Sequence, residues 1–306
     1  MNDLLRLRLA GLYGVALTRD LADCGYGRHG VRSLVRAGYL VRVRAGAFVE
    51  GSRHRESDTV TRHLLEARAV ARSLGRGYSV SHLSAVATLG LPVVTSDIGL
   101  VHVSPVGQGK SRQDLRLRVH PPVAAAEVTR RGGVLVVNPA LAVIQTASCD
   151  GLRAGLIAAD AALARGLATA ESLARALESS GLAGESARTV GLANGLSESP
   201  GESWSRMVFA GLGLPTPELQ VEIRDERGLL VGRVDFLFRA QRTIVEFDGL
   251  VKYDGADGRQ ALISEKRRED SLRSLGYQMV RPTWRDLYDP PRLHQAMISA
   301  FARALH

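Results

Sequence analysis

The stretch TIVEFDG, residues 243–249, places acidic side chains inside an otherwise apolar strand. Side chains alternate across a strand, so Glu246 and Asp248 share one face while Val245 and Phe247 share the other. Two carboxylates in a core strand repel each other and are costly to desolvate unless a cation or a proton neutralises them. The stretch therefore predicts a strand that carries a neutralised acidic site.

The preceding strand, VGRVDFLF at 231–238, supplies a further acid. If the two strands pair as a meander around residues 239–242, Asp235 lies beside Glu246 at one edge of the sheet. Converging carboxylates form a hard-oxygen site that suits Mg²⁺ or Mn²⁺. Such a cation would neutralise the cluster, activate water and stabilise charge on a phosphate.

Residues 198–306 alternate helical and strand patterns in an order typical of a small mixed sheet. The helix ESWSRMVFAGLG (202–213) precedes the strands LQVEI, VGRVDFLF and TIVEFDG. The charged helix ALISEKRREDSLRSLG (261–276) and the strand YQMVR follow. We therefore expect a C-terminal domain over 198–306 with a mixed sheet flanked by helices.

This C-terminal segment resembles the very-short-patch-repair-like branch of the PD-(D/E)XK nucleases. The matching residues are GES at 201–203, LPTPELQ at 214–220, VDF at 234–236, VEFDG at 245–249 and the pattern ExxRxxxLxxxGY at 265–277. The resemblance implies a Mg²⁺-dependent endodeoxyribonuclease. Its metal ligands would be Glu202, Asp235 and Glu246, and its catalytic residues Asp235, Glu246, Asp248 and Lys252.

The chain departs from the superfamily because Asp248 stands where the catalytic lysine is expected, two residues after Glu246. Lys252 is the first candidate to replace that lysine. Lys266 and Arg268 are the alternatives, and both are candidate phosphate contacts. Arginine is a poor proton donor, but it can stabilise charge on a phosphate.

A structural alternative explains the same acids without chemistry. Asp235, Glu246 and Asp248 would then only form ion pairs with Arg233, Lys252 and the basic helix. The nuclease fold would be degenerate and retained for DNA binding alone.

Residues 1–55 show the pattern of a winged helix-turn-helix domain. A helix is expected from Thr18, which is a good N-cap residue, and Gly25 and Gly27 break the chain before a second helix. That helix places Val31, Leu34, Val35 and Leu40 inward. The stretch LVRVRAGAFVE (40–50) alternates apolar and basic residues around a turn, as a two-stranded wing does.

The predicted second helix carries Arg28, Arg32 and Arg36 at a spacing of four residues, on one face. Such a helix would enter the major groove of double-stranded DNA. The candidate DNA-binding residues on the helix and the wing are Arg28, His29, Arg32, Ser33, Arg36, Arg42 and Arg44. The alternative is a solvated basic helix in a packing domain.

Most of residues 1–195 resemble the AbiEi-like antitoxins of abortive-infection systems. The resemblance rests on LTRDLADCGYGRHGVRSLVRAGYLVRVRAGAFV (17–49) and on VVNPALAVIQTA (136–147), which lacks the usual Arg and Asp. It implies DNA binding and autoregulation. A cognate toxin protein is a candidate partner, although the resemblance does not say whether one exists. The alternative function is therefore a non-enzymatic transcriptional regulator or antitoxin of a type IV toxin–antitoxin system.

Residues 56–197 alternate amphipathic helices and short strands, which predicts an α+β middle domain. His54, His63, His82, His102 and His120 show no ligand spacing in the sequence, so no chemistry is assigned to this segment. The whole chain is thus expected to be an α+β multidomain protein.

The composition agrees with a nucleic-acid partner. The 306 residues carry a net charge of +9 and a pI of about 10.1, and basic side chains release counterions from phosphate. The distant cysteines, Cys24 and Cys149, argue against a disulfide scaffold and for a reducing compartment. No membrane span and no small-molecule cofactor are expected, so we predict a bacterial protein of the cytoplasm that is associated with the nucleoid.

Overall fold

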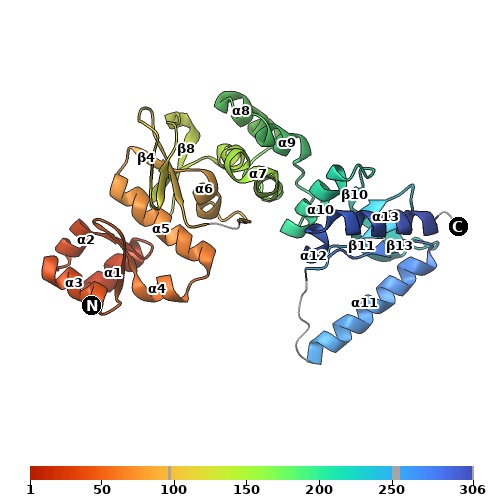
Figure 1. Cartoon of the computed structure of the whole chain (residues 1–306). Helices are drawn as coiled ribbons and strands as arrows, with labels where there is room; N and C mark the ends of the chain where they lie inside the picture. Colours follow the sequence, from red (N-terminus) through yellow and green to blue (C-terminus); the bar gives the residue numbers. More distant parts are fainter. Residues whose placement is uncertain (96–97, 250–255, 305–306) are drawn as a thin grey trace. The chain divides into compact units, whose positions relative to one another are not determined.

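The computed structural model describes residues 1–95, 98–249 and 256–304. The chain forms two compact units, Met1–Ala193 and Asn194–His306 (Figure 1). Helices flank several β-sheets, which confirms the predicted α+β class. The predicted boundary near residue 197 lies close to the junction of the two units, while the boundary at residue 55 falls inside the first unit and remains a prediction.

The first unit begins with a small three-stranded sheet and three helices. In order along the chain, the elements are α1 (Asp3–Gly11), β1 (Val15–Leu17), α2 (Thr18–Asp23), α3 (Arg28–Arg36), β2 (Leu40–Arg44) and β3 (Ala47–Glu50). The strands are antiparallel in the order β1-β3-β2. Leu34 is buried on α3 as predicted, and Val31 and Val35 are partly buried beside it. Leu40, which was assigned to the same helix, is buried as the first residue of β2 instead.

The start of α2 differs by one residue from the prediction. Thr18 is the first residue of the helix, and Leu17 occupies the cap position. The carboxylate of the buried Asp20 accepts the backbone N–H of Leu17 at 2.7 Å and so performs the capping. Arg72 donates to the same carboxylate at 2.9 Å, which compensates its burial.

The rest of the first unit surrounds a six-stranded mixed sheet. Its helices are α4 (Gly51–Glu56), α5 (Thr59–Leu74), α6 (His82–Thr88), α7 (Pro139–Ala164), α8 (Ala170–Ser180), α9 (Glu185–Leu192) and the short 3-10 helix Ala125–Glu127. Its strands are β4 (Tyr78–Val80), β5 (Val101–Pro105), β6 (Arg112–Asp114), β7 (Leu117–Val119), β8 (Val128–Arg131) and β9 (Val134–Val137), in the order β6-β7-β5-β4-β9-β8.

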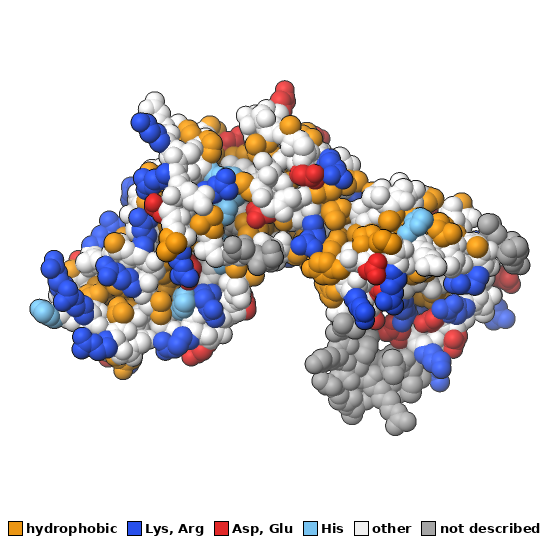
Figure 2. Space-filling model, viewed as in Figure 1, with side chains coloured by type: hydrophobic (Ala, Val, Ile, Leu, Met, Phe, Trp, Pro, Cys, Tyr) orange, Lys and Arg blue, Asp and Glu red, His pale blue; other side chains and the backbone are white. Residues whose placement is uncertain are grey.

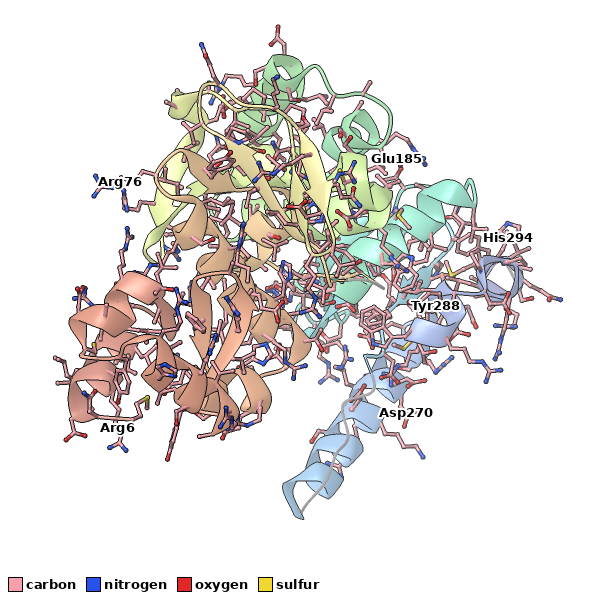
Figure 3. The ribbon with its side chains drawn as sticks, turned by 60° about the vertical axis from the view of Figure 1, so that its left-hand side comes forward. Arg6, Arg76, Glu185, Asp270, Tyr288 and His294 are labelled. Atoms are coloured by element: carbon pink, nitrogen blue, oxygen red, sulfur yellow. The ribbon has the colours of Figure 1, made fainter. Side chains whose placement is uncertain are left out.

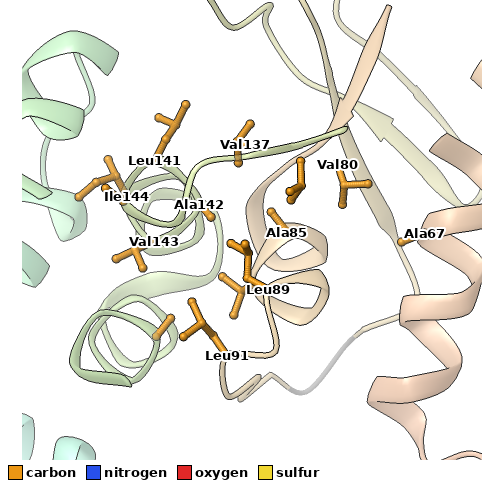
Figure 4. Packing of buried hydrophobic residues seen from close by; sticks show 14 of the residues in the cluster. Ala67, Val80, Ala85, Leu89, Leu91, Val137, Leu141, Ala142, Val143 and Ile144 are labelled. Atoms are coloured by element: carbon orange, nitrogen blue, oxygen red, sulfur yellow. The ribbon is translucent and has the colours of Figure 1, made fainter. Parts of the chain in front are cut away.

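Helices α6 and α7 pack beside this sheet over a core of aliphatic side chains (Figure 4). Val80 and Val137 come from the strands, Ala85 and Leu89 from α6, and Ile144 from α7. Helix α7 starts with a proline, as the sequence predicts, and is broken at Gly151, whose φ of 86° lies in the left-handed region. The break follows directly after Cys149 and Asp150.

The second unit follows the predicted order of one helix, three strands, one helix and one strand. The elements are α10 (Pro200–Gly211), β10 (Glu218–Arg224), β11 (Leu230–Phe238), β12 (Thr243–Val245), α11 (Ala256–Ser274), β13 (Gln278–Val280), α12 (Trp284–Leu287) and α13 (Pro290–Ala304). The sheet order is β10-β11-β12-β13, antiparallel except for the parallel pair β12–β13. Helix α11 starts earlier than the predicted residue 261.

Helices pack against this sheet through aromatic and aliphatic side chains. The ring of Phe209 in α10 meets Phe236 and Phe238 edge to face, with centroids 5.4 and 5.6 Å apart. Leu272 of α11 joins a cluster with Leu237 and Ile244. Among the described residues, none of the helices is long and apolar enough to cross a membrane.

Candidate active site

The pairing of β11 with β12 brings two acids together. Phe236 pairs with Val245 in antiparallel register, so the next position outward sets Asp235 opposite Glu246. Beyond β12 the chain stays alongside β13, because the N–H of Glu246 donates to the carbonyl of Val280 at 3.1 Å. The backbone therefore holds both acids at the same end of the sheet.

Asp235 is a half-buried carboxyl whose charge is poorly compensated. Its Oδ2 accepts the backbone N–H of Phe247 at 2.9 Å, and Gln220 also donates to it. Burial is the main cause that raises the pKa of Asp235 to about 6, and the charges of Glu202 and Glu246 add to it. This carboxyl favours a proton or a cation as its partner.

Glu202 reaches this cluster from the first turn of α10 and is only 7% exposed. Its carboxylate accepts the hydroxyl of Ser199 at 2.7 Å and the N–H of Glu198 at 2.9 Å, while its own N–H donates to Ser199 Oγ at 3.2 Å. Ser199 therefore caps α10, and the Glu202 carboxylate binds the residues around this cap. Glu202 therefore stabilises the start of α10, and its charge also acts on Asp235.

Gln220 links the two carboxylates, although it was assigned no role among the candidate site residues. Its Nε2 donates to Glu202 Oε2 at 2.9 Å, and its side chain also bonds Asp235. The pairs Leu219–Phe236 and Val221–Val234 place Gln220 opposite Asp235. Its φ of 52° is unusual for a residue other than glycine, and such strain often accompanies a functional site.

Glu246 is held by two arginines. Arg268 of α11 donates to both carboxylate oxygens, at 2.7 and 2.9 Å, and Arg281 donates to one of them at 3.2 Å. Arg281 also contacts Glu265 at 3.0 Å. Arg233, expected from the sequence as a partner of the acids, instead pairs with Glu198 at 2.7 Å. The ion-pair alternative thus applies to Glu246, through Arg268 of the basic helix as expected and through Arg281, which the sequence did not indicate.

A cleft of about 790 Å³ opens over these residues. Asp248 and Lys266 are exposed in its lining, together with Asp235, Glu246 and Arg268. Figure 3 shows Asp270, another lining residue, on α11. Lys252, the first candidate for the catalytic lysine, lies outside the described residues, so its role stays a prediction.

The candidate DNA-binding residues lie on α3 and on the β2–β3 hairpin. Five of them are exposed on α3: Arg28, His29, Arg32, Ser33 and Arg36. Arg42 is exposed on β2, whereas Arg44 is partly buried and its Nη1 finds no hydrogen-bond partner among the described residues. The helix therefore presents a basic face on the surface of its unit.

The structure also brings together histidines that the sequence had left unassigned. His82, His102 and His120 are buried side by side, with the rings of His82 and His120 stacked 3.4 Å apart. Burial is the main cause that lowers the pKa of His120 to about 3, and it lowers the pKa of His82 as well. The sequence shows no metal-ligand motif here because the three histidines come from α6, from β5 and from the end of β7.

The chain is similar to known proteins whose names state no activity. No protein-family model matches the chain. Two uncharacterized proteins of Mycobacterium tuberculosis, MT2308 (strain CDC 1551 / Oshkosh) and Rv2248 (strain ATCC 25618 / H37Rv), are each 29% identical over 207 residues, which span 67% of this chain and 74% of theirs. The crystal structure of the RV2827C protein from the same species matches 65% of this chain and 78% of its own, with a TM-score of 0.38 and 20% identity.

Proposed function

We propose that this chain is a DNA-binding protein whose second unit is a metal-dependent endonuclease of the PD-(D/E)XK type. One observation carries the proposal: Asp235 and Glu246 adjoin the antiparallel pair Phe236–Val245, and they are close enough for the charge of Glu246 to raise the pKa of Asp235. Gln220 connects Asp235 to the buried Glu202. The three acids named as metal ligands from the sequence thus belong to one cluster beside one cleft.

The donor set fits Mg²⁺ or Mn²⁺. Carboxylate oxygens are the ligands that these hard cations prefer, and the raised pKa of Asp235 indicates negative charge that its neighbours do not offset. Asp235, Glu202 and Glu246 would hold the cation. When bound, it supplies Lewis-acid chemistry that activates water and offsets charge on a phosphate.

The other residues of the cleft suit a phosphodiester substrate. Arg268 and the exposed Lys266 come from α11 and can hold phosphate oxygens as charge develops on them. Asp248, which is exposed in the same lining, would accept a hydrogen bond from the attacking water. Lys252 is the proposed source of proton transfer or charge stabilisation.

We assign DNA binding to the N-terminal segment, as a winged helix-turn-helix. The order α1-β1-α2-α3-β2-β3 with a β1-β3-β2 sheet supports this assignment, since α3 would be the recognition helix and β2–β3 the wing. In the view of Figure 2, Lys and Arg side chains gather over this segment. Double-stranded DNA is the partner that such a surface would attract.

Calorimetric titration with Mn²⁺ tests the proposed metal site. The wild type should bind Mn²⁺, and Asp235→Asn should lose at least tenfold in affinity, because the substitution keeps the size of the side chain and removes its charge. Glu226→Gln is the matched control, since Glu226 is exposed in the β10–β11 turn and does not line the cleft. A wild type that binds no Mn²⁺ would refute the site.

The bidentate salt bridge between Arg268 and Glu246 favours a second, non-enzymatic function. Arg268 already neutralises Glu246, as expected if the acids only stabilise the fold. The chain would then be a non-enzymatic transcriptional regulator or antitoxin with a degenerate nuclease fold, and a cognate toxin would be its candidate partner. DNA binding without metal binding or cleavage would select this function.

A further inference from the structure

A second cluster of ligating side chains lies in the first unit, within the segment to which the sequence assigned no chemistry. His82 is the first residue of α6, His120 follows β7, and Cys149 precedes the break in α7. One potential ligand atom of each residue lies within 4.8 Å of the other two. We propose that His82, His120 and Cys149 form a transition-metal site, and that Zn²⁺ is the cation it suits best.

The ligand types point to zinc rather than to magnesium. Imidazole nitrogen and thiolate sulfur are borderline or soft ligands, whereas Mg²⁺ requires oxygen. Tetrahedral Zn²⁺ with bonds of about 2.0–2.3 Å sets its ligand atoms roughly 3.3–3.8 Å apart. The observed separations of up to 4.8 Å therefore need shifts of about 1 Å to close around the cation.

Hydrogen bonds orient both histidine rings. His82 Nδ1 lies 3.0 Å from Ser81 Oγ, and His120 Nε2 lies 2.9 Å from His102 Nδ1. Partners of this kind fix the ring orientation of metal-ligating histidines. His102 itself is buried and thus acts as a positioning residue in this proposal.

His82 has a strained backbone conformation, which sets the direction of its side chain in the cluster. Its φ is 52°, in the left-handed region that few residues other than glycine and asparagine adopt. The side chain of the buried Gln145 accepts the N–H of His82 at 3.2 Å, which holds this conformation.

The surroundings provide room and a buried carboxyl oxygen, although the positive Arg118 also acts on His82, His120 and Cys149. A cavity of about 280 Å³ is lined by His82 and His120, which leaves space for a water molecule or a substrate at the fourth position of the cation. The side chain of Asp150, next to Cys149, has a buried Oδ2 without a hydrogen-bond partner among the described residues. Cys149 is exposed, so a cation can reach the cluster from solvent.

Cobalt substitution of the full chain tests the site by spectroscopy. With Co²⁺ added to the metal-free protein, we expect one tetrahedral ion per chain with ligand-field absorption and a thiolate-to-cobalt charge-transfer band. Zn²⁺ should displace it. The acidic cleft of the other unit offers no thiolate, so this band cannot arise there.

Variants make the test specific. Cys149→Ser should abolish the charge-transfer band, and His82→Asn should weaken Co²⁺ binding at least tenfold while asparagine tolerates the positive φ. His294→Gln is the control, because His294 lies on α13 of the other unit (Figure 3) and should leave the spectrum unchanged.

Alkylation of Cys149 gives an independent readout. Zn²⁺ should protect this exposed thiol from iodoacetamide in the folded wild type. The proposal is overturned if the wild type shows no charge-transfer band, if the band survives in Cys149→Ser, or if Zn²⁺ leaves the alkylation rate unchanged.

Discussion

Arg268 donates to both carboxylate oxygens of Glu246, at 2.7 and 2.9 Å, across the space between α11 and the sheet. This bond raises the pKa of Arg268 further, so the guanidinium stays charged at every relevant pH. A divalent cation at the proposed site would therefore compete with Arg268 for the same carboxylate. If the proposed nuclease is active, Arg268 turns from Glu246 toward the phosphate when cation and DNA bind.

Removal of this competitor should strengthen metal binding. Arg268→Gln is expected to raise Mn²⁺ affinity about tenfold, or about 1.4 kcal/mol, because Glu246 loses its bidentate salt bridge. Calorimetric titration without DNA measures the effect. Arg267→Gln is the control on the same helix, since Arg267 is exposed and does not line the cleft. Equal affinities for Arg268→Gln and wild type would contradict the competition.

Asp235→Asn should stabilise the metal-free protein at neutral pH. The pKa of Asp235 is about 6 in the folded protein against an ordinary value of 3.8, so the folded state binds more protons than the unfolded state between these pH values. Stability is therefore lost as the pH rises from about 4 to 6, and asparagine avoids the loss. After solvent screening is allowed for, the gain at pH 7 should be about 1–2 kcal/mol.

Urea unfolding in the presence of a chelator measures this effect. The gain should nearly vanish at pH 3, which lies below both pKa values, so that the wild-type carboxyl is mostly protonated in both states. A variant that is no more stable than the wild type at pH 7, or that is equally stabilised at pH 3, would refute the assigned protonation. Because the measurement needs no metal or DNA, it is independent of catalysis.

Gly201→Ala should disturb the contact between α10 and Phe247. A Cβ at residue 201 would meet the Phe247 ring at 2.0 Å, and that ring is packed against Trp284 with centroids 4.7 Å apart. We expect a loss of about 1–3 kcal/mol in the free energy of unfolding from overpacking. Gly211→Ala, in the same helix but with no atom near its Cβ, should be neutral or stabilising. Similar effects of the two substitutions would contradict the packing.

The basic face of α3 should control affinity for DNA. Arg32 and Arg36 are exposed on this helix, so Arg32→Ala together with Arg36→Ala should weaken binding of duplex DNA. The slope of log affinity against log salt should fall by roughly one unit for each lost phosphate contact. Arg76→Ala, an exposed arginine of the same unit outside α3 (Figure 3), is the control. An unchanged slope in the double variant would reject the interface.

The sequence predicted the parts of the acidic cluster that depend on strand periodicity. The alternation in 231–238 and 243–249, with a short connection, is sufficient to set Asp235 opposite Glu246. The order of elements in the second unit followed from the same patterns and from its glycines and prolines. Apolar periodicity likewise gave the buried position of Leu34 on α3.

Contacts between distant segments could not be predicted in this way. Arg281 reaches Glu246 because β13 is parallel to β12, a pairing that no local pattern specifies. Gln220 has a positive φ and donates a hydrogen bond to Glu202. A positive φ cannot be predicted from the residue type of a glutamine. The cluster of His82 and His120 joins α6 to the end of β7, so linear spacing carried no metal-ligand signal.

Cleavage of supercoiled plasmid DNA with Mg²⁺ or Mn²⁺ tests the proposed endonuclease most directly. The wild type should nick or linearise the plasmid only when the cation is present, Asp235→Asn should be inactive although folded, and Glu226→Gln should cut like the wild type. Single-stranded and linear DNA are assayed in parallel. If the wild type binds no metal and cuts none of these substrates, or if Asp235→Asn cuts as well as the wild type, the proposed active site is contradicted.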